Sequence, residues 1–296
     1  MDRRGFLLGA GALALAGCAR VPPAGVSGRA TPSSGPAPLA VGSDGTLAGV
    51  LLAHLVAQAL VTGGREAAVT AAEADWLASL GDGSLAAVPD YAATLWAELS
   101  DADEPPAARA VVTDVATLVA PEVSALAAEA VDGSLVWLVT PATAKAGITS
   151  LNRLTGWADG KAAAVPDLAL SRADGVPGLK AVYGADLVPR TVADPAERAA
   201  LVAGGTAAIG AFRRTEYTGV AGLVALDDPD QLGAPDPLVL LLHAGLADSE
   251  PDAVLALDEL ARALRTETLL DLQAKVAGGA RPAEVARAWL GEAGVA

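Results

Sequence analysis

The chain has 296 residues, which is enough for one large or two moderate domains. Its composition is 52% hydrophobic but only 3% aromatic, so a core must be built mainly from Ala, Val and Leu. The formal net charge of −15 argues against a nucleic-acid partner and against electrostatic docking on anionic lipid, because few cations are available to neutralise phosphates. We expect a solvated acidic surface and no nucleic acid.

Residue types that often build catalytic and metal sites are scarce. Cys18 is the single cysteine, so no intrachain disulfide and no cysteine-based metal site is possible. His54 and His243 both lie in apolar runs, which is typical of buried or half-buried imidazoles. Nucleophile-elbow, Walker, zinc-protease and EF-hand spacings are absent. We therefore expect no enzyme, no cofactor and no metal.

Residues 1–17 predict a signal peptide, because two arginines precede an apolar stretch too short to span a membrane. The ending Leu15-Ala16-Gly17-Cys18 resembles a bacterial lipoprotein signal, in which Cys18 is lipidated and becomes the first mature residue. A cleaved secretory peptide with an incidental cysteine is the alternative. The pair Arg3-Arg4 resembles a twin-arginine signal, and export by the general secretory route stays open.

Residues 18–38 are expected to be the lipidated cysteine and a disordered tether, because they are rich in Pro, Gly, Ser and Ala without apolar periodicity. The folded part is expected to begin near Leu39. These features predict a protein held by lipid at the extracytoplasmic face of the cell membrane.

Strand-like and helix-like runs alternate beyond Leu39, which predicts an α/β fold with a mainly parallel sheet in each half. Strands are expected at residues 39–41, 67–70, 85–88, 134–140, 162–165, 187–192, 206–212 and 238–242. Helices are expected at 47–60, 71–80, 91–99, 122–131, 149–157, 178–183 and 194–203, and from Pro251, Thr266 and Pro282.

The stretch 81–94, GDGSLAAVPDYAAT, is the clearest candidate for a ligand contact. It predicts a tight turn, a short strand and a Pro-Asp-Tyr corner that opens a helix. In open α/β sheets, a strand that ends at a helix N-terminus presents backbone N–H groups to ligands. Tyr91 lies at that corner. The alternative is that Tyr91 only covers an edge of the core.

The order of these features resembles the substrate-binding lipoproteins of ABC importers for osmoprotectants such as glycine betaine and choline. The landmarks are Val41-Gly42-Ser43, the run that ends at Tyr91, the block from Arg172 to Gly184 (RADGVPGLKAVYG) and the helix start at 282–286. The resemblance covers about residues 39–292. It implies a type II periplasmic-binding-protein fold, with two α/β lobes joined by two crossover strands and the ligand cleft between them.

The resemblance also implies a division of the chain. Lobe 1 is expected to be discontinuous, 39–140 plus 222–296, and lobe 2 to span 141–221. The first crossover is expected after Trp137 and the return near residues 217–226. The lobes would close on the ligand by a hinge motion.

In this family a cage of aromatic rings holds a quaternary ammonium by cation–π attraction, and basic and hydroxyl groups hold a carboxylate. By resemblance, Tyr91 and Phe212 occupy cage positions. Thr94 occupies the position of the carboxylate-side hydroxyl, and Arg172 that of the carboxylate-binding arginine.

Three positions depart from the family pattern. Asp44 stands where a lysine is usual, and Leu135 where a cage tyrosine is expected, although Trp137 on the same strand face is a substitute. Asp236 stands where the family has a tyrosine. Losing a lysine and gaining two carboxylates favours a cation over a zwitterion. The alternative is that Asp44 and Asp236 face solvent.

The sequence thus predicts a monomeric, lipid-anchored solute-binding protein of an ABC importer. Its expected ligand is a small quaternary-ammonium or other cationic amine, and its expected partners are the permease subunits in the membrane. The alternative is a non-transporting envelope sensor or interaction protein on the same fold with an eroded ligand cage.

Overall fold

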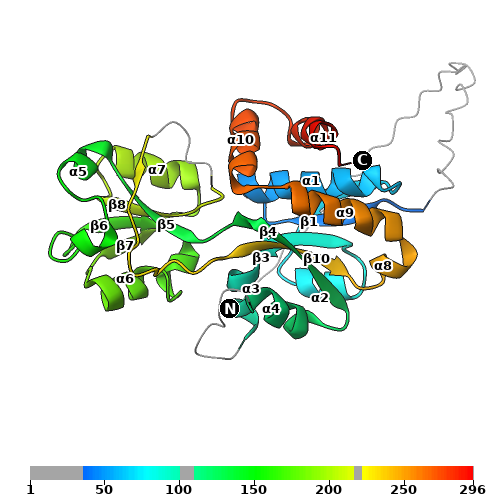
Figure 1. The fold of residues 1–296 in the computed structure, drawn as a ribbon, viewed down its shortest axis with the longest axis horizontal. Helices are drawn as coiled ribbons and strands as arrows, with labels where there is room; N and C mark the ends of the chain where they lie inside the picture. The colour runs from blue at the N-terminus through cyan, green and yellow to red at the C-terminus, as the bar shows by residue number, and fades with distance from the viewer. Residues whose placement is uncertain (1–35, 101–109, 217–221, 296) are drawn as a thin grey trace, which may run out of the picture. The chain divides into compact units, whose positions relative to one another are not determined.

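The computed structural model describes residues 36–100, 110–216 and 222–295. These residues build two five-stranded sheets with helices packed on them, which makes the fold a mixed α/β one (Figure 1). The expected signal peptide at 1–17, Cys18 and nearly all of the expected tether lie outside the described residues. No helix in the described ranges is long and apolar enough to cross a membrane.

The first sheet has the strand order β2-β1-β3-β10-β4. β1 pairs in parallel with β2 and β3, whereas β10 runs antiparallel to β3 and β4. The bounds of these strands are β1 Leu39–Ser43, β2 Ala67–Ala71, β3 Ala87–Tyr91, β4 Val123–Asp132 and β10 Pro237–His243.

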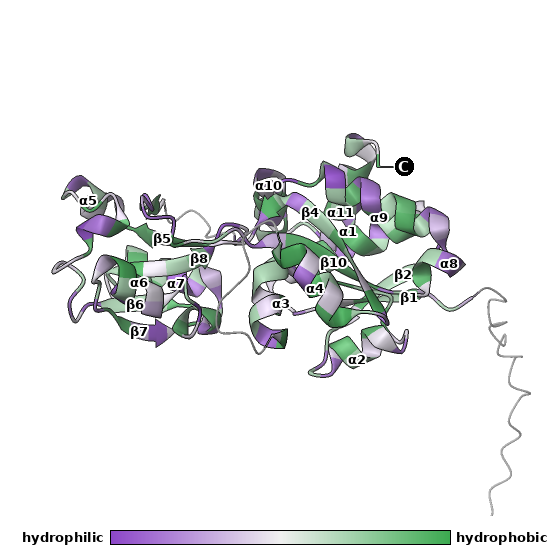
Figure 2. Ribbon diagram, turned by 60° about the horizontal axis from the view of Figure 1, so that its bottom comes forward, coloured by the Kyte–Doolittle hydropathy of each residue, from purple (hydrophilic) through white to green (hydrophobic). Residues whose placement is uncertain are grey.

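Strand β10 shows how the sequence builds this sheet, because its run PLVLLLH is apolar on both faces. Leu238, Leu240 and Leu242 pack into the core cluster on one face, and Val239 and Leu241 into the cluster on the other. Figure 2 shows β10 in hydrophobic colours. The first cluster is covered by α1 (Leu47–Thr62), α8 (Leu246–Ser249), α9 (Pro251–Ala263), α10 (Thr266–Ala277) and α11 (Pro282–Ala293). The second is covered by α2 (Trp76–Gly81), α3 (Ala92–Leu99) and α4 (Val111–Val119).

The second sheet has the order β7-β6-β8-β5-β9. β6 is parallel to β7 and β8, while β5 is antiparallel to β8 and β9. Its strands are β5 Leu135–Val139, β6 Ala162–Val165, β7 Val188–Thr191, β8 Ile209–Arg213 and β9 Val224–Ala225. Its helices are α5 Pro141–Lys145, α6 Val176–Tyr183 and α7 Pro195–Ala203, with short 3₁₀ turns at Leu151–Arg153 and Asp167–Leu170.

Several expected elements are confirmed, and two are wrong. Helices begin at Pro251, Thr266 and Pro282, and Asp194 caps α7 by accepting from the Ala196 N–H at 2.8 Å. The helix predicted at 149–157 is only the 3₁₀ turn Leu151–Arg153. The helix predicted at 122–131 is instead the strand β4. Its Ala and Glu residues favour a helix intrinsically, but pairing along β10 overrides that preference.

The sheets also differ from the expected mainly parallel arrangement, since each combines parallel and antiparallel pairs. The antiparallel pairs arise where the chain passes from one sheet to the other. Strand β5, which contains Trp137, pairs with β8 and β9 in the second sheet, although residues up to 140 are expected in lobe 1 from the sequence. We therefore propose that the crossovers lie at residues 133–134 and 226–236.

Candidate functional site

A cavity of about 610 Å³ is lined by side chains from elements of both sheets. On the first-sheet side the lining includes the residues after β1, the end of β3, and parts of α1, α2, α3 and α10. On the second-sheet side it includes the turn after β6, the start of α7 and the residues at and after the end of β8. The charged and aromatic lining residues are Asp44, Trp76, Asp90, Tyr91, Glu98, Asp167, Arg172, Arg213 and Glu216.

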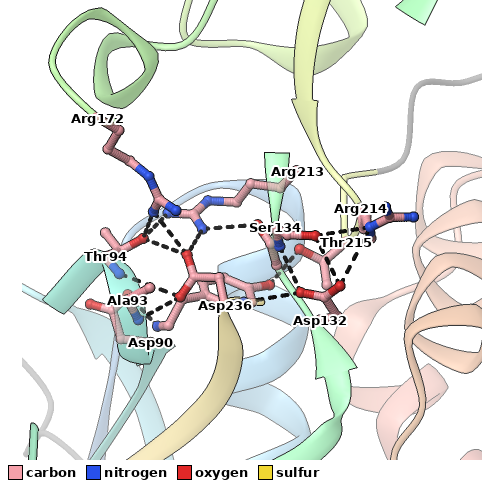
Figure 3. Close-up of polar contacts among 12 residues, drawn as sticks. Asp90, Ala93, Thr94, Asp132, Ser134, Arg172, Arg213, Arg214, Thr215 and Asp236 are labelled. Atoms are coloured by element: carbon pink, nitrogen blue, oxygen red, sulfur yellow. Dashed lines mark hydrogen bonds and ion pairs between the residues drawn. The ribbon is translucent and has the colours of Figure 1, made fainter. Parts of the chain in front are cut away.

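Beside this cavity, the fully buried carboxylate of Asp236 collects five hydrogen bonds (Figure 3). Its Oδ1 accepts from the Ala93 N–H at 2.7 Å and from the Thr94 N–H at 3.3 Å, so it caps the N-terminus of α3 from a distant part of the sequence. Its Oδ2 accepts from the Thr94 hydroxyl at 2.8 Å, from Arg172 at 2.9 Å and from Arg213 at 3.0 Å. Burial alone would raise the pKa of Asp236, but the two guanidinium groups hold it below its usual value.

Each of the two arginines donates to several acceptors within the chain. Arg172 donates to both oxygens of Asp174, at 2.7 and 2.8 Å, and to the Thr94 hydroxyl oxygen at 2.7 Å. Arg213 donates to the same Thr94 oxygen at 2.8 Å and to the Gly133 carbonyl at 3.3 Å. These contacts, with Asp236, join α3 of the first sheet to the end of β8 and the loop before α6.

Tyr91 lies at the end of β3 with 8% of its surface exposed. Its hydroxyl donates to Thr215 Oγ1 at 2.6 Å, and the Arg213 guanidinium lies over its ring, 4.5 Å from the centroid. Gly133 fits tightly against the ring edge, because a Cβ at this position would be 2.3 Å from Tyr91 Cδ1. One face of the ring is thus already covered by a cation.

Four carboxylates of the cavity wall, Asp44, Asp90, Glu98 and Asp167, have no ion-pair partner within the described part of the chain. Asp90 is half-buried on β3, and its Oδ1 accepts from the Tyr91 N–H at 2.7 Å. Burial raises the pKa of Asp90 to about 7, against the opposing effects of this hydrogen bond and of Arg213. Such a carboxylate gains most from a neighbouring cation.

The fifth wall carboxylate, Glu216, is paired. Glu216 forms an ion pair with the fully buried side chain of Arg198 in α7. It also accepts from the backbone N–H of Arg213 at 3.0 Å. Arg198 in turn lies over the ring of Phe212, 5.2 Å from the centroid. This pair joins α7 to the end of β8.

A second cluster of hydrogen bonds ties the two crossover segments together (Figure 3). Asp132 accepts from the Ser134 N–H at 2.9 Å, from the Ser134 hydroxyl at 2.9 Å and from the Asp236 N–H at 3.1 Å. Arg214 forms an ion pair with Asp132 at 3.4 Å. These contacts hold Asp132 and Ser134, at the first proposed crossover, against Asp236 at the end of the second.

The structure brings some of the expected binding residues together and separates others. Asp44, Tyr91, Thr94 and Arg172 line one cavity. Asp236 is buried, does not line it, and hydrogen-bonds two of its lining residues.

Trp137 and Phe212 do not line the cavity either. Trp137 is 2% exposed and packs into the second sheet's main core cluster, and Phe212 is fully buried against Leu138 and Ala199. Leu135, at the expected position of a cage tyrosine, also lies in the core. Cys18 lies outside the described residues.

Among the charged and aromatic lining residues, sequence reasoning missed Trp76, Asp90, Glu98, Asp167, Arg213 and Glu216. Arg213 follows Phe212 directly on β8, so the alternation of a strand, applied to that pair, would have placed it on the opposite face. Asp90 belongs to the Pro-Asp-Tyr corner already singled out. Within the described residues, no group of three or more His, Cys, Asp or Glu side chains is placed to hold a metal ion.

Comparison with known proteins identifies the family. A family model described as the substrate binding domain of the ABC-type glycine betaine transport system matches residues 37–292. No curated protein matches the sequence.

Solved structures share the fold at low sequence identity. Apo YehZ from Escherichia coli is 20% identical with a TM-score of 0.68, over 88% of this chain and 100% of that one. A glycine betaine/carnitine/choline ABC transporter structure is 16% identical with a TM-score of 0.71, over 87% and 99%. Lactococcal OpuAC complexed with glycine betaine is 14% identical with a TM-score of 0.60, over 86% and 95%.

These structures show the type II periplasmic-binding-protein fold, and the expected fold class is confirmed. The matching family consists of extracytoplasmic solute-binding proteins, not enzymes. With its match over residues 37–292, this chain belongs to the substrate-binding domains of ABC-type glycine betaine transport systems.

Proposed function

We propose that this protein is the lipid-anchored receptor of an ABC importer and binds a small quaternary-ammonium or other cationic amine. One observation carries the proposal: the cavity wall has four carboxylates without an ion-pair partner in the described chain, while its two arginines are paired with Asp174 and Asp236. An entering cation meets unpaired negative charge. An entering anion is repelled by the same charge, and among the described residues both cations of the wall, Arg172 and Arg213, are already paired.

The remaining wall suits the apolar groups of such an amine. Leu47, Leu52 and Val88 provide aliphatic surface. Trp76 and the part of the Tyr91 ring that Arg213 does not cover provide aromatic surface. Methyl groups on nitrogen gain from apolar and aromatic contact, and the cation–π attraction adds about 2 kcal/mol where the cation is desolvated.

The delivery step is proposed from family membership. Cys18 would carry the lipid that holds the protein at the extracytoplasmic face. The two lobes, each centred on one sheet, would close on the ligand, and the closed monomer would dock on the permease subunits.

A thermal-shift screen of the purified protein tests the proposal. The compounds are choline, carnitine, glycine betaine, polyamines and basic amino acids. A ligand that binds only the folded state adds about 2.7 kcal/mol of stability at a hundred times its dissociation constant. We expect a shift with at least one cationic amine, and tight glycine betaine binding by calorimetry would contradict the preference for a cation.

A second candidate, a non-transporting envelope sensor or interaction protein, is favoured by one observation. The expected cage residues Trp137 and Phe212 lie in the core, and Arg213 covers a face of Tyr91. Absence of a shift with every compound in the screen would favour this function.

A further inference from the structure

The hydrogen-bonding groups around Asp236 form a complete binding site for a carboxylate. The backbone N–H groups at the start of α3, the Thr94 hydroxyl and two guanidinium groups all converge on its two oxygens. Helix N-termini and arginines are the donors that recognise ligand carboxylates in general. Here the carboxylate they hold belongs to the chain, and its side chain is fully buried.

The Arg213 guanidinium takes the place of a ligand's positive charge at the Tyr91 ring. The Arg213 guanidinium lies 4.5 Å from the centroid of the Tyr91 ring, the position from which a ligand ammonium would be attracted to the ring. The same guanidinium donates to Asp236 Oδ2 at 3.0 Å. One internal ion pair therefore places a cation on the aromatic ring and a carboxylate among the donors.

These are the two opposite charges that a zwitterionic amino acid or betaine presents to a binding site. A zwitterion can use Tyr91 and the donors around Thr94 only by displacing this pair. Displacement leaves both chain charges buried without their partners, which is strongly unfavourable. A cation without a carboxylate can bind without displacing the pair, because Asp90 and Glu98 line the same cavity.

We propose that the Arg213–Asp236 ion pair occupies the positions at Tyr91 and Thr94 where the two charges of a zwitterion would bind. The pair thereby makes the protein select cationic amines over zwitterions. The proposal deepens the proposed function and rests on it for the location of the ligand. It assigns Asp236 and Arg213 as specificity-determining residues.

Choline and glycine betaine are the matched probes, because both carry a trimethylammonium group and only glycine betaine carries a carboxylate. Calorimetry on the wild-type protein is expected to show choline binding about tenfold tighter than glycine betaine. In Asp236→Asn, Arg172 and Arg213 lose their shared carboxylate, while the amide oxygen still accepts from α3. The ratio of the two affinities is expected to shift about tenfold or more towards glycine betaine.

Asp186→Asn is the matched control, because it removes an exposed carboxylate that pairs with Lys180 outside the cavity. It is expected to leave the ratio unchanged. Arg213→Gln is the second variant: it uncovers Tyr91 and leaves Asp236 paired with Arg172. It is expected to strengthen choline binding about threefold or more.

An unchanged ratio in folded Asp236→Asn would overturn the proposal. If Asp236→Asn does not fold, the Arg213→Gln variant decides: an unchanged affinity for choline would then overturn the proposal. Should wild type bind neither probe, the proposed function is decided by the other amines of the thermal-shift screen, and the inference is decided separately. Glycine betaine binding gained by Asp236→Asn supports it, and no gain refutes it.

Discussion

Asp90 and Asp236 are two aspartates at one site, but their surroundings give their carboxyl groups opposite preferences. Asp236 has two guanidinium partners and a helix N-terminus, so its pKa is lowered and it stays charged. Asp90 accepts from the Tyr91 backbone N–H, but burial dominates and raises its pKa to about 7. The Asp236 carboxylate is held by partners within the chain, and the Asp90 carboxyl is available to a ligand cation.

We expect cation binding to depend on the protonation of Asp90. Below about pH 7 its carboxyl is neutral, so affinity for a cationic amine falls as the pH is lowered from about 8 to about 6. Asp90→Asn is expected to bind about tenfold more weakly at pH 8, with a flatter pH profile. Calorimetry across this range measures both, and Asp271→Asn, an exposed carboxylate outside the cavity, is the control.

The Asp90 carboxyl also makes the stability of the protein depend on pH, and in the opposite direction: ligand affinity is expected to rise with pH, whereas stability is expected to fall. Its pKa is higher in the folded than in the unfolded state, so the folded protein binds more protons between about pH 4 and pH 7. The contribution of Asp90 to stability therefore falls as the pH rises through this range. Asp90→Asn is expected to have a higher Tm than wild type at pH 8. A lower Tm there would contradict a desolvated, unpaired carboxylate.

Among the secondary-structure elements, the junction of β4 and β5 packs against Tyr91 and Arg213 of the site. Gly133 lies at this junction, donates its N–H to the Asp236 carbonyl at 2.8 Å and accepts from Arg213 through its own carbonyl. A side chain there would collide with Tyr91, which has little room to move because its hydroxyl is held by Thr215.

Gly133→Ala is expected to destabilise the protein by about 1–3 kcal/mol, the usual cost of overpacking a core position. Gly291 in α11 is the control, because a Cβ there meets no other atom within 4 Å. Gly291→Ala is expected to raise stability by about 0.5–1 kcal/mol. Urea denaturation measures both, and an unchanged free energy of unfolding in Gly133→Ala would show that the ring moves freely.

The elements also show where local sequence patterns suffice. Helices marked by a proline or a capping residue, such as α7 after Asp194 and α9 at Pro251, begin where the pattern predicts. Strand β4 does not follow its local preference for a helix. At the edge of the sheet it pairs with β10, and a helix there would leave the backbone groups on that side of β10 without hydrogen-bond partners.

The chain as a whole combines a folded domain with an expected N-terminal anchor, and the anchor is testable by itself. Cys18→Ser is expected to move the protein from the membrane fraction to the soluble fraction of its bacterial host, because only a lipidated Cys18 would hold it there. Immunoblots of the fractions measure the distribution, with Ser33→Ala in the expected tether as control. A wild-type protein found in the soluble fraction would contradict the lipid anchor.

The sequence by itself determined the family, the α/β class and most helix starts, because these depend on local motifs and on the period of apolar residues. It also marked Tyr91, Thr94 and Arg172, which the structure places in one cavity. Only the tertiary structure decided that Trp137 and Phe212 face the core and that Asp236 is bound by two arginines. Those outcomes depend on which face of a strand is buried and on contacts between residues far apart in the chain, such as Asp236 with Thr94, and no local pattern encodes them.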